Sequence, residues 1–353
     1  MQKIINEIKL DFDDVLIRPK RSGLNSRSEV CLNREFTFAH SPRKISCTPI
    51  VAANMDTTGT FAMAQSLGSH DAITCLHKHY TPQDYINFYS SSQVLNKDLV
   101  FYSLGTTTKD IEKLTEVFNG IAQYGNQLPN ICVDIANGYT EKFVKTISHI
   151  RKLYPDIIIM AGNVVTPEMV EELIFHGKVD IVKVGIGSGS VCTTRLKTGV
   201  GYPQLSAIME CSDAAHGLSG HICSDGGCKV VGDICKAFGA NSDFVMLGSM
   251  LAGTDECEGE WEYDIEMNKT SLKFYGMSSK DAMHKHHNGV AKYRTAEGKT
   301  VQVPYKGLAL EILQDILGGL RSACTYIGAS KIKDFGKKTT FLQVNNTHNR
   351  IFE

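Results

Sequence analysis

Residues 156–185 read DIIIMAGNVVTPEMVEELIFHGKVDIVKVG and contain one strand–helix–strand unit. Its two apolar runs, 156–161 and 179–185, have the length and composition of strands that are buried on both faces of a parallel sheet. Between them, Thr166-Pro167-Glu168 supplies an N-cap, a proline at the first helical position and an early acid, and Gly177 ends the predicted helix. The stretch therefore predicts a βαβ unit.

The same pattern recurs along the chain at intervals of roughly 25–35 residues, the size of such a unit. The predicted strands lie at 48–54, 71–76, 98–104, 130–136, 156–161, 179–185, 220–224 and 242–247. Eight buried strands that alternate with helices favour a (β/α)8 TIM barrel over a doubly wound sheet, which rarely needs so many regular units. No shift in composition marks a second domain, so we expect one catalytic domain across residues 1–353.

Two segments fall outside this repeat. Residues 1–47 form a polar N-terminal arm, and residues 250–304 form a polar insertion between the eighth strand and the last helix, which we expect from about 307 to 328. The insertion contains a hairpin-like stretch at 260–274. A long insertion at this place is usually functional and often acts as a lid, so we expect a flap over a binding site.

The composition excludes several classes of protein. The formal net charge is −1, so there is no global basic field that would favour nucleic acid. The apolar runs are strand-sized and well short of the ~18 residues that a membrane span needs. The chain has 11 cysteines, but none are spaced C-x-x-C, and several lie within apolar strand runs. These features indicate a reduced, cytoplasmic enzyme with neither a nucleic-acid nor a membrane partner.

Polar residues and glycines collect where the predicted strands end, which is where barrels bind their ligands. They are Asn54-Met55-Asp56, His77-Lys78-His79, Asp134 with Asn137-Gly138, Gly162-Asn163, the loop 185–194, Asp225-Gly226-Gly227 and Gly248-Ser249. The last two follow strands seven and eight, the usual place for a phosphate. Each alone is an ordinary glycine turn, but as a pair they favour a phosphate site.

The loop 185–194, GIGSGSVCTT, is the strongest candidate for chemistry. Its glycines allow close approach of the backbone to a ligand, and Cys192 has hydroxyl neighbours in Thr193 and Thr194. An isolated cysteine is more often structural, but this context favours a nucleophile. Lys78 is open to two interpretations, an anion contact or a solvated rim residue. The histidines His284, His286 and His287 have no carboxylate or cysteine at ligand spacing, so we expect no metal there.

Residues 185–195, GIGSGSVCTTR, followed by 198–204, TGVGYPQ, resemble the catalytic loop of the IMP dehydrogenase/GMP reductase family. Further similar motifs span nearly the whole chain: LDFDDVL at 10–16, AANMD at 52–56, DIANGY at 134–139, AGNVV at 161–165, SDGG at 224–227 and FYGM at 274–277. The resemblance implies a TIM barrel that acts on purine nucleotides.

Two features resemble the reductive branch of the family. Dehydrogenases usually carry a regulatory CBS pair after the second strand, and the segment between His79 and Asp134 has no room for one. The insertion lacks the long Arg-Tyr flap of the dehydrogenases and reads YRTAEGKTVQVPYKG at 293–307. The alternatives are a dehydrogenase without its regulatory pair and a barrel that senses purines without chemistry.

The resemblance to the reductive branch implies an irreversible, NADPH-dependent conversion of GMP to IMP and ammonia. Cys192 would attack C2 of the guanine ring, and ammonia would leave with a proton from the pair Thr194 and Glu297. Hydride from NADPH would then reach C2 of the resulting thioimidate, and the thiolate would leave. The resemblance thus makes Glu297 a catalytic residue, although composition alone places it in a solvated loop.

The remaining roles also come from the resemblance. The substrate would contact Asp225, Gly226, Gly227, Gly248, Ser249, Gly276, Met277, Ser278, Arg294, Thr295, Ala296, Glu297 and Gly298. NADPH would contact Lys78, Asp134, Ile135, Ala136, Ile186, Gly187, Met277, Tyr293, Arg294, Ser322, Ala323, Cys324 and Thr325, with Ser26 and Arg27 reaching in from a neighbouring subunit of a homotetramer. The carbonyl groups of Gly187, Gly189 and Cys192 would hold K⁺ near Arg195. This chain departs from the family pattern at Ser188, where proline is common, and at Ser249, where glycine is usual.

Overall fold

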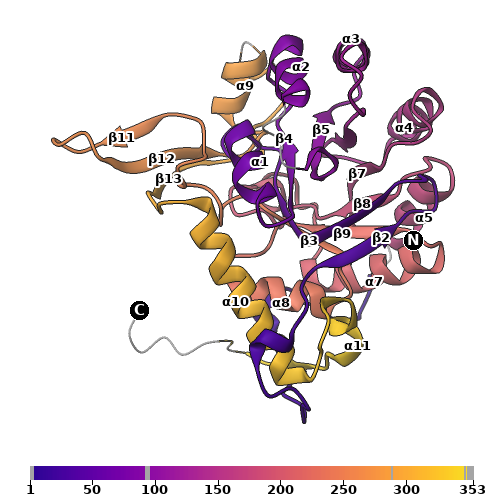
Figure 1. The fold of residues 1–353 in the computed structure, drawn as a ribbon, viewed down its shortest axis with the longest axis vertical. Coiled ribbons are helices and arrows are strands. Elements are labelled where there is room, and N and C mark those ends of the chain that lie inside the picture. The colour runs from indigo at the N-terminus through magenta and orange to yellow at the C-terminus, as the bar shows by residue number, and fades with distance from the viewer. Residues whose placement is uncertain (1–3, 92–95, 288, 346, 348–353) are drawn as a thin grey trace.

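The computed structural model describes residues 4–91, 96–287, 289–345 and 347 (Figure 1). Its centre is a closed parallel barrel of eight strands: β3 (Lys44–Ala52), β4 (Ala72–Leu76), β5 (Val100–Leu104), β6 (Asn130–Asp134), β7 (Ile159–Val164), β8 (Ile181–Val184), β9 (His221–Asp225) and β10 (Phe244–Leu247). Each strand pairs with the next, and β10 pairs with β3 to close the ring. The predicted TIM barrel and all eight of its strands are confirmed.

Several strand boundaries differ from the prediction by a few residues, and the start of β7 shows why. The run 156–161 was expected as a strand, but β7 begins at Ile159. The N–H groups of Ile158 and Ile159 donate to the side chains of Asn130 and Asp180, at 3.0 and 2.9 Å. Because side chains rather than a neighbouring strand accept these two N–H groups, the regular ladder starts later than the apolar run.

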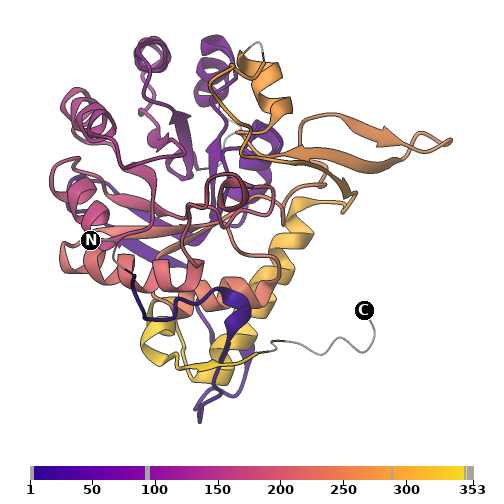
Figure 2. The same ribbon diagram turned by 180° about the vertical axis from the view of Figure 1, so that it is seen from behind.

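Helices surround the barrel and link its strands (Figures 1 and 2). They are α1 (Phe61–Gly68), α2 (Pro82–Ser90), α3 (Thr108–Gln123), α4 (Glu141–Leu153), α5 (Pro167–Phe175), α7 (Gln204–Gly217), α8 (Val231–Gly239) and α10 (Ala309–Ile327). The predicted start of α5 is confirmed, with Thr166 at the N-cap and Pro167 in the first turn. Its apolar face, Val170, Leu173 and Ile174, is buried against the barrel.

The barrel interior is packed and closed at its amino-terminal end. Side chains such as Phe101, Met160 and Phe244 fill it, all at most 2% exposed. Strand β2 (Arg34–Thr37) pairs antiparallel with the start of β3 and places Phe36 on Phe244, with ring centroids 4.3 Å apart. Ligands are therefore left with the carboxyl-terminal end of the strands.

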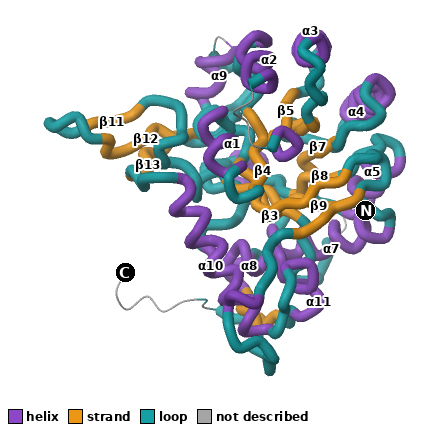
Figure 3. The backbone as a smooth tube through the Cα atoms, in the orientation of Figure 1, coloured by secondary structure: helices purple, strands orange, loops and turns teal. Residues whose placement is uncertain are grey.

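The two segments outside the repeat have structure of their own (Figure 3). In the arm, β1 (Val15–Ile17) pairs with β14 (Phe341–Gln343), which follows the short helix α11 (Phe335–Lys338). The insertion forms an antiparallel sheet of β11 (Trp261–Tyr263), β12 (Lys269–Tyr275) and β13 (Thr300–Pro304), with helix α9 (Lys280–His287) between the last two strands. The predicted hairpin is confirmed as β11 and β12, and Figure 1 shows it projecting away from the barrel.

Two further expectations concern the chain as a whole. All 11 cysteines are free thiols, and nine of them are buried. In the part of the chain that the structure describes, no helix has the length and apolar character needed to cross a membrane.

Candidate active site

A cavity of about 500 Å³ lies at the carboxyl-terminal end of the barrel. Residues at or just after the ends of all eight barrel strands line it, and the insertion adds residues from Phe274 to Glu297. The polar and glycine residues that follow the strands in the sequence therefore meet around one space. This is the end at which barrel enzymes carry their chemistry.

Cys192, Thr194 and Glu297 form one hydrogen-bonded chain at this cavity. The thiol of Cys192 donates to Oγ1 of Thr194 at 3.2 Å, and that hydroxyl donates to Oε2 of Glu297 at 2.8 Å. Thr194 and Glu297 are 103 residues apart in the sequence. The arrangement gives a proton on the sulfur a direct path to a carboxylate.

Backbone contacts bring the insertion to the cysteine loop. Cys192 and Gly298 form an antiparallel bridge. The N–H of Thr193 donates to the carbonyl of Glu297 at 2.8 Å, and the N–H of Lys299 donates to the carbonyl of Val191 at 2.9 Å. The carboxylate of Glu297 is thus positioned by main-chain bonds on both sides of it.

The cysteine loop needs its glycines for close packing on β9. Gly185 has φ +156°, and a Cβ there would lie 2.0 Å from the carbonyl oxygen of Asp225. Ser188, the departure from the family pattern, donates its hydroxyl to the same carbonyl at 3.1 Å. The serine therefore ties the loop to the end of β9 through a bond that proline could not make.

The two glycine turns after β9 and β10 present backbone donors to the cavity. Gly226 and Gly227 have φ values of +92° and +88°, conformations that favour glycine. Among the described residues, the N–H groups of Gly226, Gly227 and Ser249 donate to no backbone or side-chain acceptor. Unpaired N–H groups at adjacent strand ends are suited to a phosphate.

Cationic side chains also line the cavity. Lys78 lies there with its ammonium 3.8 Å from Asp110, and Arg294 and His287 line the same cavity. Burial, together with the charges of Lys78 and Arg294, lowers the pKa of His287. Asp134 adds a carboxylate to the same cavity.

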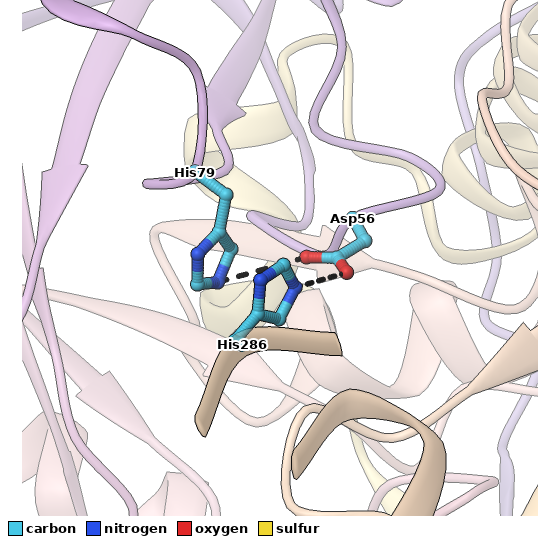
Figure 4. A group of neighbouring side chains, drawn as sticks. All are labelled: Asp56, His79 and His286. Atoms are coloured by element: carbon cyan, nitrogen blue, oxygen red, sulfur yellow. Dashed lines mark hydrogen bonds and ion pairs between the residues drawn. The ribbon is translucent and has the colours of Figure 1, made fainter. Parts of the chain in front are cut away.

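Asp56, His79 and His286 form a further group beside the cavity (Figure 4). Their ligand-type atoms lie within 4.8 Å of one another, although Asp56 and His286 are 230 residues apart, so sequence spacing could not reveal the group. The two imidazole rings are stacked with centroids 3.4 Å apart and planes 6° apart. Ring nitrogens bind a metal in the plane of the ring, so two parallel stacked rings do not direct their lone pairs at one ion. The geometry does not suit a metal.

The group instead holds the insertion to the barrel. His286, on α9, donates Nε2 to Asp56 at 2.6 Å, and the hydroxyl of Tyr275, at the end of β12, donates to it at 2.8 Å. Burial would raise the pKa of Asp56, but these bonds and the charge of Lys285 keep it below its ordinary value. Burial lowers the pKa of His79 to about 3, so its ring is neutral and stacks on His286.

Comparison with known proteins identifies the family. The family model described as IMP dehydrogenase / GMP reductase domain matches residues 9–350. The chain belongs to this family. Proteins named GMP reductase are 55% identical over 350 residues in Vibrio cholerae and 56% identical over 353 residues in Aliivibrio salmonicida, covering 99% of both chains in each case. One from Phytophthora infestans is 55% identical over 354 residues, with 100% of this chain and 95% of the relative covered.

Among the described residues, two of the three carbonyl groups predicted to hold a cation in the cysteine loop accept no hydrogen bond. The carbonyl of Gly189 accepts the N–H of Cys192 at 3.1 Å, whereas those of Gly187 and Cys192 accept no hydrogen bond from the described residues. Carbonyl oxygens are ligands that suit a hard monovalent ion. Arg195 packs against Gly187, and its charge is paired with Asp11 at 3.0 Å.

Several residues predicted from the family resemblance lie outside the cavity lining. Thr295, Ala296 and Gly298 are in the insertion close to Glu297, and Tyr293 is 89% exposed. Ser322, Ala323, Cys324 and Thr325 are on α10, where Cys324 is fully buried. Ser26 and Arg27 lie at a short turn that packs on α10 of the same chain. The roles predicted for these residues are not tested by this placement.

Lys183 is a charged residue of the site that was not predicted from the sequence. Lys183 lies within the apolar run 179–185, and its ammonium is buried between Asp134 and Asp225. The signal was available, because a lysine inside a strand buried on both faces needs a charged partner.

Proposed function

We propose that this chain catalyses the irreversible, NADPH-dependent reductive deamination of GMP to IMP and ammonia, in purine nucleotide interconversion and salvage. The observation that carries the proposal is the direction of the hydrogen bonds from Cys192 through Thr194 to Glu297. The names of the relatives, which match this chain over almost its full length, support the same activity. A cytoplasmic homotetramer is part of the proposal and comes from the family resemblance.

The chain of hydrogen bonds accounts for the proton in the first step. The sulfur of Cys192 would bond to C2 of guanine while its proton passes through Thr194 to Glu297. The same proton would return through Thr194 to the exocyclic amine as the bond between C2 and that nitrogen breaks. The thiol proton thus becomes the third hydrogen of ammonia, and the base is left attached to the enzyme as a thioimidate.

The rest of the site would hold the two nucleotides for the second step. The unpaired N–H groups of Gly226, Gly227 and Ser249 would bind the phosphate of GMP. Lys78 and Asp134 would orient the cofactor, and the loop carbonyls of Gly187, Gly189 and Cys192 would hold K⁺. NADPH, when bound, supplies hydride to C2. Departure of the thiolate of Cys192 then gives IMP.

The test is turnover of GMP with NADPH, followed by ammonia release, beside a parallel assay with IMP and NAD⁺. We expect ammonia and IMP only in the first assay; turnover only of IMP would establish a dehydrogenase instead. Mass spectrometry with GMP and no NADPH should detect an adduct on Cys192. Cys192→Ala should abolish it, and Cys31→Ala, which changes an exposed thiol outside the cavity, should not. Nucleotide binding with no adduct would indicate a purine-sensing barrel.

A further inference from the structure

A lysine is buried at the floor of the cavity between two carboxylates. Lys183 is the third residue of β8, and its side chain is 1% exposed. Its ammonium lies 2.8 Å from Oδ1 of Asp134 and 3.1 Å from Oδ2 of Asp225. Burial alone would lower the pKa of Lys183, but the two carboxylates outweigh this effect and hold the pKa above its ordinary value. The ammonium is therefore charged.

Each carboxylate has a second contact besides the ammonium. Asn54 donates Nδ2 to Oδ2 of Asp134 at 3.0 Å, and Asn163 donates Nδ2 to Oδ2 of Asp225 at 2.9 Å. Oδ1 of Asp225 accepts no hydrogen bond from the described residues and is not among the buried unpaired atoms, so it is open to a ligand. Both carboxylates line the cavity.

The lysine connects two parts of the site that would bind different nucleotides. Asp134 ends β6, on the side predicted for the cofactor, and Asp225 ends β9, on the side predicted for the substrate. Lys183 is on β8 and reaches both. One positive charge thus faces two negative charges. Among the described residues, its other polar contacts are uncharged: Asn54 at 3.4 Å and the sulfur of Met246 at 3.6 Å.

We propose that Lys183 is a positioning residue shared by the substrate and cofactor halves of the site. Its contacts with Asp134 and Asp225 balance their charge and hold them in place, so that each accepts a ribose hydroxyl of its own nucleotide. The identity of the two nucleotides rests on the proposed function. The role of the ammonium toward the two carboxylates does not, because it follows from the contacts alone.

The first test replaces Lys183 by methionine, which has a similar length and no charge. Asp134 and Asp225 are only partly exposed and lie on either side of the ammonium, so without it their charges repel and one should take up a proton near neutral pH. We expect Lys183→Met to bind GMP and NADPH about tenfold or more weakly at pH 7 by calorimetry. Affinity should recover as the pH rises toward 9 and both carboxylates ionise. Unchanged affinity at every pH would overturn the proposal.

Removing one carboxylate as well should rescue one ligand selectively. In the double variant with Lys183→Met and Asp134→Asn, Asp225 has no competitor for ionisation, so GMP affinity should return to within about threefold of that of Asp134→Asn alone. With Lys183→Met and Asp225→Asn, NADPH affinity should return and GMP affinity should not. Each double variant removes one positive and one negative charge, so it can be tested even if Lys183→Met alone does not fold. Double variants no better than Lys183→Met would indicate a merely structural lysine.

A ligand-free measurement separates this inference from the proposed function. If the unmodified protein binds neither GMP nor NADPH, the proposed function fails, but the proton uptake can still be measured. When the pKa of a carboxylate is higher in the folded than in the unfolded state, the folded protein loses stability as the pH rises. The variant to use is Lys183→Met or, if that does not fold, the most conservative uncharged replacement of Lys183 that does. Its melting temperature should fall relative to that of the unmodified protein as the pH is raised from 5 to 8. Parallel curves would overturn the role of Lys183, whatever the substrate is.

Discussion

Replacing Asp56 by asparagine should loosen the insertion and leave the barrel folded. Oδ2 of Asp56 accepts His286 at 2.6 Å and Tyr275 at 2.8 Å, and the ammonium of Lys285 lies 3.4 Å away. His286 and Lys285 belong to α9, and Tyr275 is the last residue of β12. A single carboxylate in the loop after β3 thus contacts two elements of the insertion.

The size of the effect follows from these contacts. A hydrogen bond to a charged group contributes about 1.5–3 kcal/mol. Asparagine keeps an oxygen for one donor but removes the charge that serves all three groups, so opening of α9 should become easier by about 2–3 kcal/mol. The amide hydrogens of α9 should then exchange roughly 30- to 150-fold faster. Because the insertion also carries Glu297, kcat/KM for GMP should fall in the same variant.

Native-state hydrogen exchange read by mass spectrometry measures this opening directly. Lys280→Ala is the matched control, since Lys280 is an exposed residue of the same helix and contacts no part of the group around Asp56. Exchange in α5, on the barrel wall, should be the same in all three proteins. If Asp56→Asn leaves α9 as protected as before, or accelerates exchange in α5 equally, the carboxylate does not hold the insertion.

Three further outcomes are expected. Glu297→Gln should lower kcat for GMP about 100-fold with little change in its Kd, because it removes the proton acceptor beyond Thr194; weaker binding with unchanged kcat would contradict this role. Gly226→Ala should lower both activity and melting temperature, since its φ is +92° and its Cβ would lie 2.6 Å from the hydroxyl of Ser188, whereas Gly217→Ala, with open space, should lower neither by this mechanism. A hydrogen bond to Asp243 raises the pKa of His216 above 6.5, so its stabilisation is complete below that pH and is lost as the pH rises through the folded value. The melting temperature difference between the unmodified protein and His216→Gln should accordingly shrink from pH 6 to pH 9.

The barrel could be predicted because its strands carry a local signal. Near-continuous apolar runs such as 179–185 need no partner to be recognised, and all eight appear in the sheet. Strand β13 was not predicted, because its residues alternate between exposed and half-buried and it exists only by pairing with β12. The start of β7 shifted for a similar reason, since Asn130 and Asp180 provide the acceptors that a neighbouring strand would otherwise supply.

The glycine turns and the cysteine of the candidate site could be predicted from the sequence. Its ion pairs between distant residues could not. Cys192 and the turns after β9 and β10 are local patterns, and they do line one cavity. The contact between Asp56 and His286 joins the loop after the first barrel strand to the insertion, so no local pattern contains it. The role of Glu297 came from the family resemblance, and only its hydrogen bond to Thr194 connects it to the cysteine.

The carboxylates at the two ends of the barrel differ in burial and in hydrogen bonding. Those at one end stabilise the fold, and those at the other end can bind a ligand. At the amino-terminal end, both oxygens of Asp243 are used: Oδ1 faces Arg34 at 2.8 Å, and Oδ2 accepts His216 at 2.8 Å and a backbone N–H at 3.0 Å. At the carboxyl-terminal end, Asp225 shares Lys183 with Asp134 and keeps one oxygen without a protein donor among the described residues. Asp243 is 1% exposed and has nothing left to offer a ligand, whereas Asp134 and Asp225 are partly exposed on the cavity and can accept a further hydroxyl group. The same strand illustrates both cases, because Asp180 just before β8 is paired with Arg151 and Lys183 near its end faces the site.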